Sequence, residues 1–95
     1  MKFKLFLHND KKITNFNQIK NLLKEHNCTW LLDCEFENAI IELKNNTIIW
    51  KDGDFYFGVI PFIIWERGNF RGGIIQNGIF LESPVSDFTV NKINQ

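Results

Sequence analysis

The sequence predicts a mainly β fold, a short β-solenoid of five-residue repeats, from three observations. Large apolar residues recur at every fifth position, as Trp50, Phe55, Ile60, Trp65, Phe70, Ile75 and Phe80. A second series, mostly glycine, runs two residues ahead of the first, as Ile48, Gly53, Gly58, Ile63, Gly68, Gly73 and Gly78. Residues two apart in an extended chain point to the same side, so each glycine and the bulky residue after it face inward together.

A period of five matches neither the 3.6 residues of a helix nor the two of a plain strand. It divides into an inward pair and a three-residue step that must contain a bend, and repetition of this step coils the chain. A Trp or Phe beside an inward glycine also conserves volume, as a filled core requires. A four-sided coil needs about 20 residues per turn, so it predicts that Phe55 stacks on Ile75 and Ile60 on Phe80, at about the 4.8 Å strand spacing.

The units GDFYF, GVIPF, IIWER, GNFRG, GIIQN and GIFLE, with CEFEN and AIIEL upstream, resemble the pentapeptide-repeat family. WKDGDF and WERGNF are also similar to W-x-x-G-x-F units of some bacterial and phage proteins. The resemblance covers about half the chain. It implies a scaffold or binding surface and supplies no catalytic residues. Gly in place of the usual Ala, and Val59, Ile64, Ile74 and Ile79 in place of Asn or Asp, depart from the pentapeptide pattern and from its regular four-sided coil.

Length and composition predict one domain over residues 1–95, with a strand–helix cap in 1–28 and a repeat-like β region in 29–90. A hydrophobic content of 44% with 10 Phe and 3 Trp indicates an ordered protein. Eleven basic and eleven acidic residues balance, which disfavours nucleic acid as a partner. Asn and Ile make up about a quarter of the chain, a bias common in A/T-rich genomes, including those of many phages.

The first residues, Met1 to Leu7, carry too short an apolar run for an export signal, and no run approaches the roughly 20 residues that span a bilayer. We therefore expect a soluble cytoplasmic protein without a membrane partner, located in the host cytoplasm if it is phage-encoded. Cys28 and Cys34 are then expected to be reduced.

In chain order, residues 2–7 predict a strand with Phe3, Leu5 and Leu7 on one face, and 9–12 a polar turn. A helix follows, capped by Asn15 with Gln18 in capping-box position, ended by Asn27 as a left-handed stop. Its apolar stripe comprises Phe16, Ile19, Leu22, Leu23 and His26.

Residues 29–43 are expected to be extended, with Phe36 and Ile41 as pentad centres and Cys34 as a small inward residue. Residues 44–47 form a turn. Val85 and Val90 keep the pentad phase beyond residue 80 although Pro84 interrupts pairing, and 91–95 is a frayed tail.

An α+β fold remains the alternative, a twisted antiparallel sheet with one packed helix. Asp52-Gly53 and Asn77-Gly78 are hairpin signals, and Arg67-Gly68 and Asn45-Asn46 are further turn candidates. This meander would pair residues symmetrically about each turn, whereas a coil pairs residues at a constant offset.

Residues with chemical potential are few. His8, His26, Cys28 and Cys34 lack the paired C-x2-C spacing that marks a zinc site, so no metal is predicted. Asp33, Glu35 and Glu37 alternate along a strand, a pattern more typical of a solvent-exposed face than of a catalytic pair. Arg67 and Arg71 beside Trp65 and Phe70 weakly resemble a nucleic-acid surface, but the aromatic residues fit a core better. We predict no enzyme activity, cofactor or small-molecule substrate.

The pentad frame instead turns many apolar residues outward, which favours a partner-binding or self-association surface. In a four-sided coil Val59 and Ile79 share a face, so the predicted binding residues are Val59, Phe62, Ile79, Leu81, Tyr56 and Phe57. The expected function is a non-catalytic interaction module, and the A/T-rich bias favours a phage-encoded binder or inhibitor of a host protein. The alternative is a self-associating structural or virion assembly component, with a homodimer as the simplest self-complex.

Overall fold

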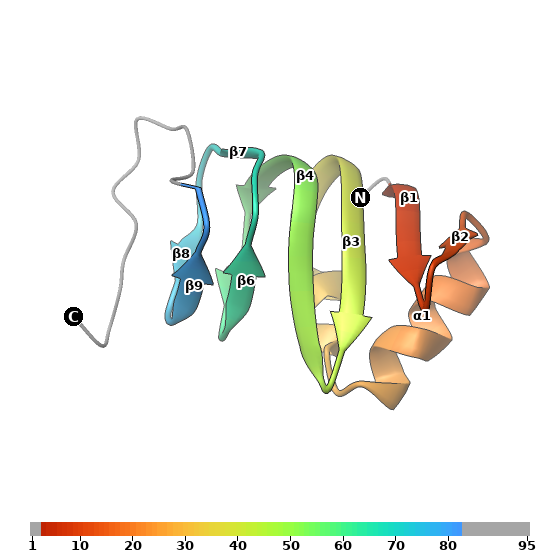
Figure 1. Cartoon of the computed structure of the whole chain (residues 1–95). Coiled ribbons are helices and arrows are strands. Elements are labelled where there is room, and N and C mark those ends of the chain that lie inside the picture. Colours follow the sequence, from red (N-terminus) through yellow and green to blue (C-terminus); the bar gives the residue numbers. More distant parts are fainter. Residues whose placement is uncertain (1–2, 83–95) are drawn as a thin grey trace.

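Nine strands, one α-helix and one 3-10 helix follow one another within residues 3–82, the part of the chain that the computed structural model describes (Figure 1). In chain order they are β1 (Phe3–His8), β2 (Lys11–Ile13), α1 (Phe16–Glu25), η1 (Thr29–Asp33), β3 (Glu35–Lys44), β4 (Thr47–Phe57), β5 (Val59–Ile60), β6 (Ile63–Trp65), β7 (Asn69–Phe70), β8 (Ile74–Ile75) and β9 (Gly78–Phe80). The expectations for Val85, Val90 and the tail at 91–95 fall outside these residues.

The larger sheet is open and mixed, in the order β2-β1-β3-β4-β6-β9, with β7 also paired to β4, while β5 and β8 form a small second sheet. The protein is therefore mainly β with one helix, which agrees with the α+β alternative rather than with a regular solenoid throughout. The antiparallel part is confined to β1–β2 and β3–β4. The hairpins expected at Asp52-Gly53 and Asn77-Gly78 are absent from this sheet, because the first pair lies inside β4 and the later strands pair in parallel.

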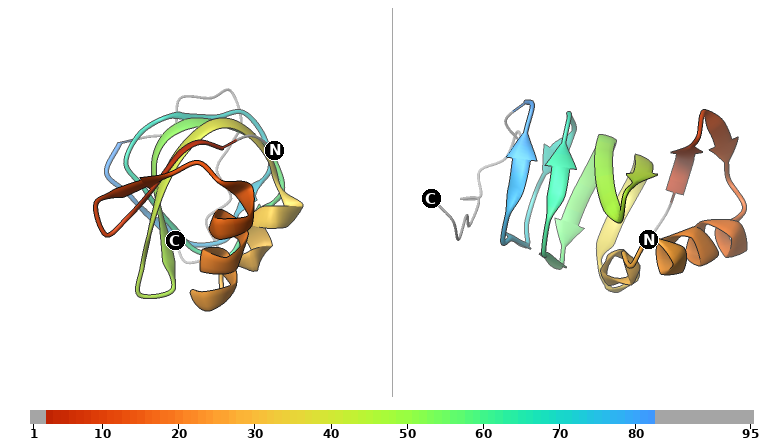
Figure 2. Two further views of the ribbon diagram at one scale, coloured as in Figure 1. Left: turned by 90° about the vertical axis from the view of Figure 1, so that its right-hand side faces the viewer. Right: turned by 60° about the horizontal axis from the view of Figure 1, so that its bottom comes forward.

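All parallel pairs after residue 47 share one offset of fifteen residues, from Ile49↔Ile64 in β4 and β6 to Trp65↔Phe80 in β6 and β9. Phe55 lies beside Phe70 and Ile60 beside Ile75, so the predicted contacts at an offset of twenty are wrong. Three pentads, not four, therefore separate paired residues. The segments that carry β4, β6 and β9 lie side by side in the right view of Figure 2, whereas they overlap in the left view.

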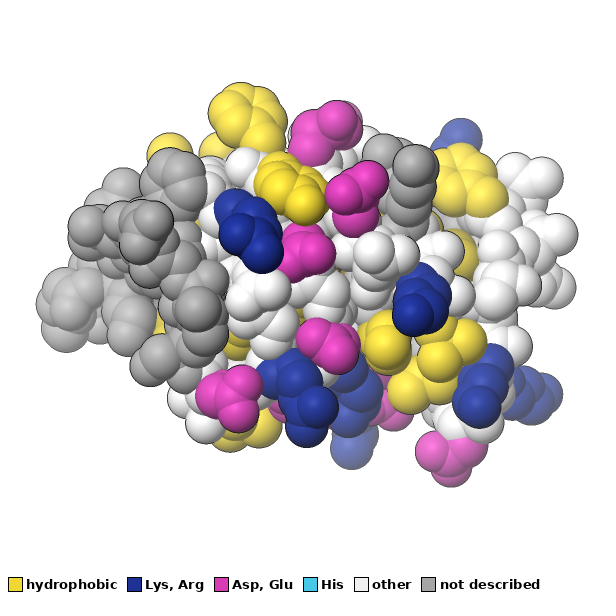
Figure 3. Space-filling view, turned by 90° about the horizontal axis from the view of Figure 1, so that it is seen from above, with side chains coloured by type: hydrophobic (Ala, Val, Ile, Leu, Met, Phe, Trp, Pro, Cys, Tyr) yellow, Lys and Arg dark blue, Asp and Glu magenta, His cyan; other side chains and the backbone are white. Residues whose placement is uncertain are grey.

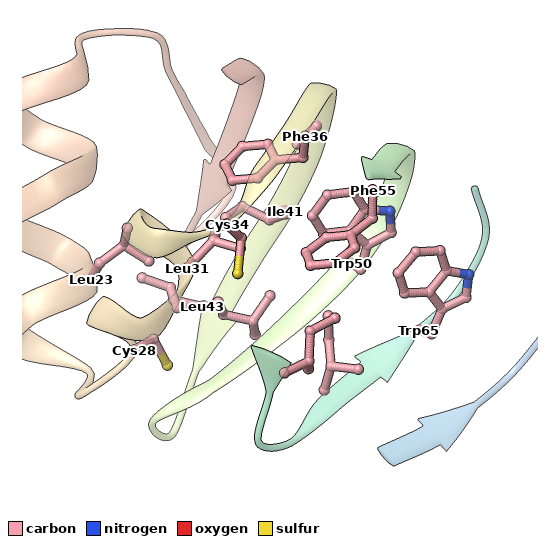
Figure 4. Close-up of a cluster of buried hydrophobic side chains, with 14 of the residues drawn as sticks. Leu23, Cys28, Leu31, Cys34, Phe36, Ile41, Leu43, Trp50, Phe55 and Trp65 are labelled. Atoms are coloured by element: carbon pink, nitrogen blue, oxygen red, sulfur yellow. The ribbon is translucent and has the colours of Figure 1, made fainter. Parts of the chain in front are cut away.

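The large apolar residues of the first series are fully buried from Trp50 to Ile75, which confirms this part of the pentad interpretation, while the glycines of the second series are half-buried. Paired rings stack face to face: Trp50 and Trp65 lie 5.2 Å apart between centroids with planes at 9°, and Phe55 and Phe70 lie 5.6 Å apart at 8°. Figure 4 shows Trp50, Phe55 and Trp65 within one layer of side chains that continues to Phe36. Stacked and edge-on aromatic pairs add about 0.5–1.5 kcal/mol each beyond their burial.

Four pentad glycines, Gly53, Gly68, Gly73 and Gly78, lie where the backbone of a neighbouring segment comes close, whereas Gly58 lies against the Cys34 side chain. Gly68 has a φ of +118°, and a Cβ built on it would lie 2.5 Å from the carbonyl oxygen of Gly53. Any side chain would therefore be both strained and in collision. Glycine at this position therefore does more than leave space beside an aromatic ring. It also allows the close approach of the neighbouring backbone and the positive φ.

The N-terminal hairpin β1–β2 turns at Asn9 and Asp10, which both have positive φ as a two-residue type I′ turn requires. β1 then pairs in parallel with β3, and its register shifts between Phe3 and Leu5. Because of this shift Phe6 is the fully buried residue of β1, and the predicted shared face of Phe3, Leu5 and Leu7 is wrong.

Helix α1 begins as predicted, since the Oδ1 atom of Asn15 accepts a hydrogen bond of 3.1 Å from the backbone N–H of Gln18. Ile19 and Leu23 are buried against the sheet, and Asn27 has the expected left-handed φ of +56°. Phe16, predicted to join the stripe, is 46% exposed because it lies in the first turn, beyond the sheet that Ile19 and Leu23 cover.

The segment after the helix departs from the extended conformation predicted for 29–43, because residues 29–33 form η1 before β3 begins. Leu31 of η1 is fully buried, and Cys34, Phe36 and Ile41 face the core as expected. The β3–β4 hairpin turns at Asn45 and Asn46, both with positive φ. One hydrophobic cluster runs from α1 through η1 and β3 to β8.

Candidate functional site

The six residues predicted to bind a partner do not form one patch. Val59 lies beside Ile74 in the small sheet, whereas Ile79 lies beside Ile64 in the large one. The shared face predicted for Val59 and Ile79 is therefore wrong, because it assumed an offset of twenty residues. Five of the six side chains are exposed and Phe62 is half-buried. Exposed apolar side chains are interspersed with charged ones on the face that Figure 3 shows.

Two of the six, Phe57 and Val59, line an apolar groove of about 480 Å³ beside the small sheet. Phe57, Val59 and Ile74 line it from β4, β5 and β8, and they are 66%, 47% and 41% exposed. Pro61, Gly58 and Gly73 complete this side. Three exposed apolar side chains thus converge on one hollow, where isolated surface residues would be scattered.

The opposite side of the groove comes from η1 and the residue that ends it: Trp30, Asp33 and Cys34. Trp30 is half-buried and packs on the core, and its carbonyl oxygen accepts a hydrogen bond of 3.5 Å from the Cys34 thiol. Burial, and next the charge of Asp33, raise the pKa of Cys34 to about 11, so its thiol is neutral near pH 7. A neutral buried thiol is part of the packing rather than a nucleophile.

Of the three carboxylates that alternate at 33, 35 and 37, Asp33 and Glu35 are exposed. Glu35 lies opposite Phe57 in the β3–β4 pair, and Glu37 accepts a hydrogen bond of 3.3 Å from the Tyr56 hydroxyl. Asp33 is the one charged residue among those that line the groove. Of the three, only Asp33 lines the apolar hollow, and Glu35 is next to it through Phe57.

A smaller hollow of about 210 Å³ lies elsewhere and is polar, lined by Lys4, Asn38, Asp52, Asp54, Asn69 and two neighbours. The Asp54 carboxylate already accepts 2.9 Å and 3.4 Å contacts from Asn69 and Arg71. Its polar groups thus bind one another.

The histidines and cysteines considered as zinc ligands separate into two places. The rings of His8 and His26 meet edge to face at 5.2 Å, and the Cys28 thiol donates to the His26 carbonyl oxygen over 3.3 Å. Cys34 instead lines the groove. Residues 3–82 contain no group of three or more His, Cys, Asp or Glu side chains that could hold a metal ion.

The aromatic residues next to Arg67 and Arg71 are not available to stack on bases, because Trp65 and Phe70 are fully buried. Arg71 contacts Asp54 at 3.4 Å. The interpretation of these aromatic residues as core is confirmed.

The residues predicted from the sequence to bind a partner include Phe57 and Val59 of the groove. Trp30, Pro61 and Ile74, which line the same groove, were not among them. The missing signal was the offset of fifteen, which places Ile74 beside Val59. A second signal was available in Trp30 and Asp33, since an aromatic and a carboxylate three residues apart share one side of a 3-10 helix.

The chain matches no protein-family model, and neither the curated proteins nor the solved structures give a significant match to it. No helix within residues 3–82 is long and apolar enough to cross a membrane. The groove is therefore the feature of the protein from which its function is inferred.

Proposed function

We propose that this protein is a non-catalytic interaction module that binds another protein through the groove beside β5 and β8. The observation that carries this proposal is the convergence of Phe57, Val59 and Ile74 on one hollow next to Trp30. Binding energy in protein interfaces concentrates where aromatic and aliphatic anchors meet a concave, desolvated site.

We also propose that residues 47–80 form a short three-sided β-solenoid, with fifteen residues in each turn. The constant offset of the parallel pairs and the face-to-face stacking of Trp50 on Trp65 and Phe55 on Phe70 support this architecture. The groove would then lie on one side of the coil, where short strands hold it rigidly. A rigid site loses little entropy when a partner binds.

The setting that we propose is the interior of a cell, and the host cytoplasm if a phage encodes the chain as a binder or inhibitor of a host protein. Cys28 and Cys34 are free thiols, which suits a reducing compartment. The phage origin is proposed because Asn and Ile are abundant, as is common in proteins from A/T-rich genomes.

Self-association as a structural or virion component, with a homodimer as its smallest form, is the second candidate. Its support is a different surface, where Ile79 is 51% and Leu81 is 67% exposed at the last described strand. The two candidates therefore use different residues and are separable by mutation.

Site-specific photo-crosslinking tests the first candidate. A photoreactive phenylalanine analogue at position 57 is expected to capture a defined protein, and the same analogue at position 81 is the control on the other surface. The captured protein is then purified and its binding to the unmodified chain is measured by calorimetry.

Ile74→Glu should weaken this binding by at least about tenfold, because a charge must be desolvated in the groove, while Ile79→Glu leaves the Kd unchanged. The two side chains have similar exposure, so they are matched in their effect on folding. Equal loss with both variants, or with neither, would refute the groove as the binding site. Concentration-dependent dimers that only Ile79→Glu dissociates would favour the second candidate.

A further inference from the structure

We propose that the groove recognises a cationic side chain, Lys or Arg, that stands next to apolar residues in an extended segment of the partner. This inference rests on the proposed function and adds the chemistry of the ligand. It is carried by the arrangement of two acidic residues and one aromatic ring around the apolar hollow.

The first step concerns Trp30 and Asp33 on η1. Side chains three apart in a 3-10 helix eclipse one another, so the indole ring and the carboxylate lie on the same side. Both line the groove. An aromatic face and a carboxylate together attract a cation through its charge and through the ring quadrupole.

The second step extends the acidic rim to Glu35. Cys34 and Phe36 on either side of it are buried, so Glu35 points outward, where it is the cross-strand neighbour of the exposed Phe57. Asp33 lines the hollow itself, and Glu35 lies next to it through its pairing with Phe57, which lines the hollow.

The third step is that no cation in the described part of the chain neutralises this rim. Among residues 3–82, Lys51 pairs with Glu66 and Glu42, and Arg71 pairs with Asp54, but Asp33 and Glu35 form no ion pair. The rim is therefore complementary to a positive charge supplied from outside. Beyond it, Phe57, Val59 and Ile74 offer apolar surface to the residues next to that charge.

Selection from a library of random peptides displayed on a carrier tests this chemistry with the full-length protein as bait. The unmodified chain is expected to enrich peptides in which Lys or Arg adjoins aromatic or aliphatic residues. The double variant Asp33→Lys, Glu35→Lys should lose this preference and enrich Asp or Glu instead. Circular dichroism and thermal melting confirm that each bait is folded.

A peptide enriched by the unmodified chain is then synthesised, and its Kd is measured by fluorescence anisotropy. The double variant Asp33→Asn, Glu35→Gln is expected to weaken the binding of this peptide about tenfold, in line with the loss of one charge-assisted contact. Asp10→Asn with Glu25→Gln is the matched control, because it removes two exposed carboxylates outside the groove and should leave the affinity unchanged.

Enriched peptides that are apolar without a basic preference, and that Ile74→Glu no longer binds, would overturn the inference while leaving the proposed function intact. If no enriched peptide depends on Ile74, both proposals fail. Sedimentation that shows a dimer dissociated by Ile74→Glu would assign the groove to a second copy and would also overturn the cationic partner.

Discussion

At four of the five pentad glycines the nearest neighbour of an added Cβ would be backbone, and this limits how the neighbouring segments can pack. At Gly68 a Cβ would lie 2.5 Å from Gly53 O, and the φ of +118° is itself rarely adopted by other residues. Backbone cannot move aside as the tip of a flexible side chain can. We therefore predict that Gly68→Ala lowers the free energy of unfolding by about 3 kcal/mol or more, as strain and overpacking add.

Chemical denaturation monitored by tryptophan fluorescence measures this effect. Gln76→Ala provides the control, because Gln76 is exposed and its substitution should change stability by less than about 0.5 kcal/mol. A Gly68→Ala protein as stable as the control would contradict the close approach of the two segments.

Strand pairing at an offset of fifteen residues is the feature of the elements that builds the groove. Val59 of β5 lies directly opposite Ile74 of β8. Adjacent parallel strands are about 4.8 Å apart, within the 4.4–6.8 Å between Cα atoms that a disulfide spans. We predict that Val59→Cys with Ile74→Cys forms a disulfide under mild oxidation, while Val59→Cys with Ile79→Cys does not.

Peptide mapping after blocking free thiols decides between the two pairs. Trypsin cleaves after Arg67 and Arg71, between the introduced cysteines, so linked peptides report the crosslink directly. Crosslinking of the second pair but not the first would support an offset of twenty residues. It would contradict the pairing of Val59 with Ile74 on which the groove depends.

The period of five could predict which side chains of these elements point inward, and it did so from Trp50 to Ile75. It could not predict how many pentads separate paired residues, because that number depends on the backbone angles of each bend. The four pentad glycines from Gly53 to Gly73 are equivalent in the sequence pattern and do not show these angles. The sequence pattern also did not predict the bulge beside Phe3 or the 3-10 helix at 29–33. An apolar run without clear periodicity does not distinguish a strand from a tight helix.

The candidate site was half predictable on the same grounds. The outward direction of Phe57 and Val59 follows from the pentad frame alone. Their convergence with Trp30 and Ile74 requires contacts between segments far apart in the sequence. A sequence periodicity carries no information about such contacts until the offset is known.

Across the whole molecule, the N-terminal α/β part and the parallel part share one hydrophobic cluster. Ring contacts run without a break from Phe3 to Phe36 at 5.0 Å, from Phe36 to Trp50 at 5.8 Å and from Trp50 to Trp65 at 5.2 Å. Stacked repeats that touch only their neighbours tend to unfold segment by segment, whereas a shared core couples its parts.

We therefore predict a single cooperative transition in urea, with the same midpoint by far-ultraviolet circular dichroism and by tryptophan fluorescence. Circular dichroism reports the strands and α1, while two of the three tryptophans that give the fluorescence, Trp50 and Trp65, lie in β4 and β6. Phe36→Ala removes the ring that joins the two parts, so it should lower the stability by about 3–5 kcal/mol and move both signals together. If the fluorescence transition instead came first while α1 stayed folded, the parallel segments would be an independently melting array, and the groove between η1 and β8 would open before the rest of the protein unfolds.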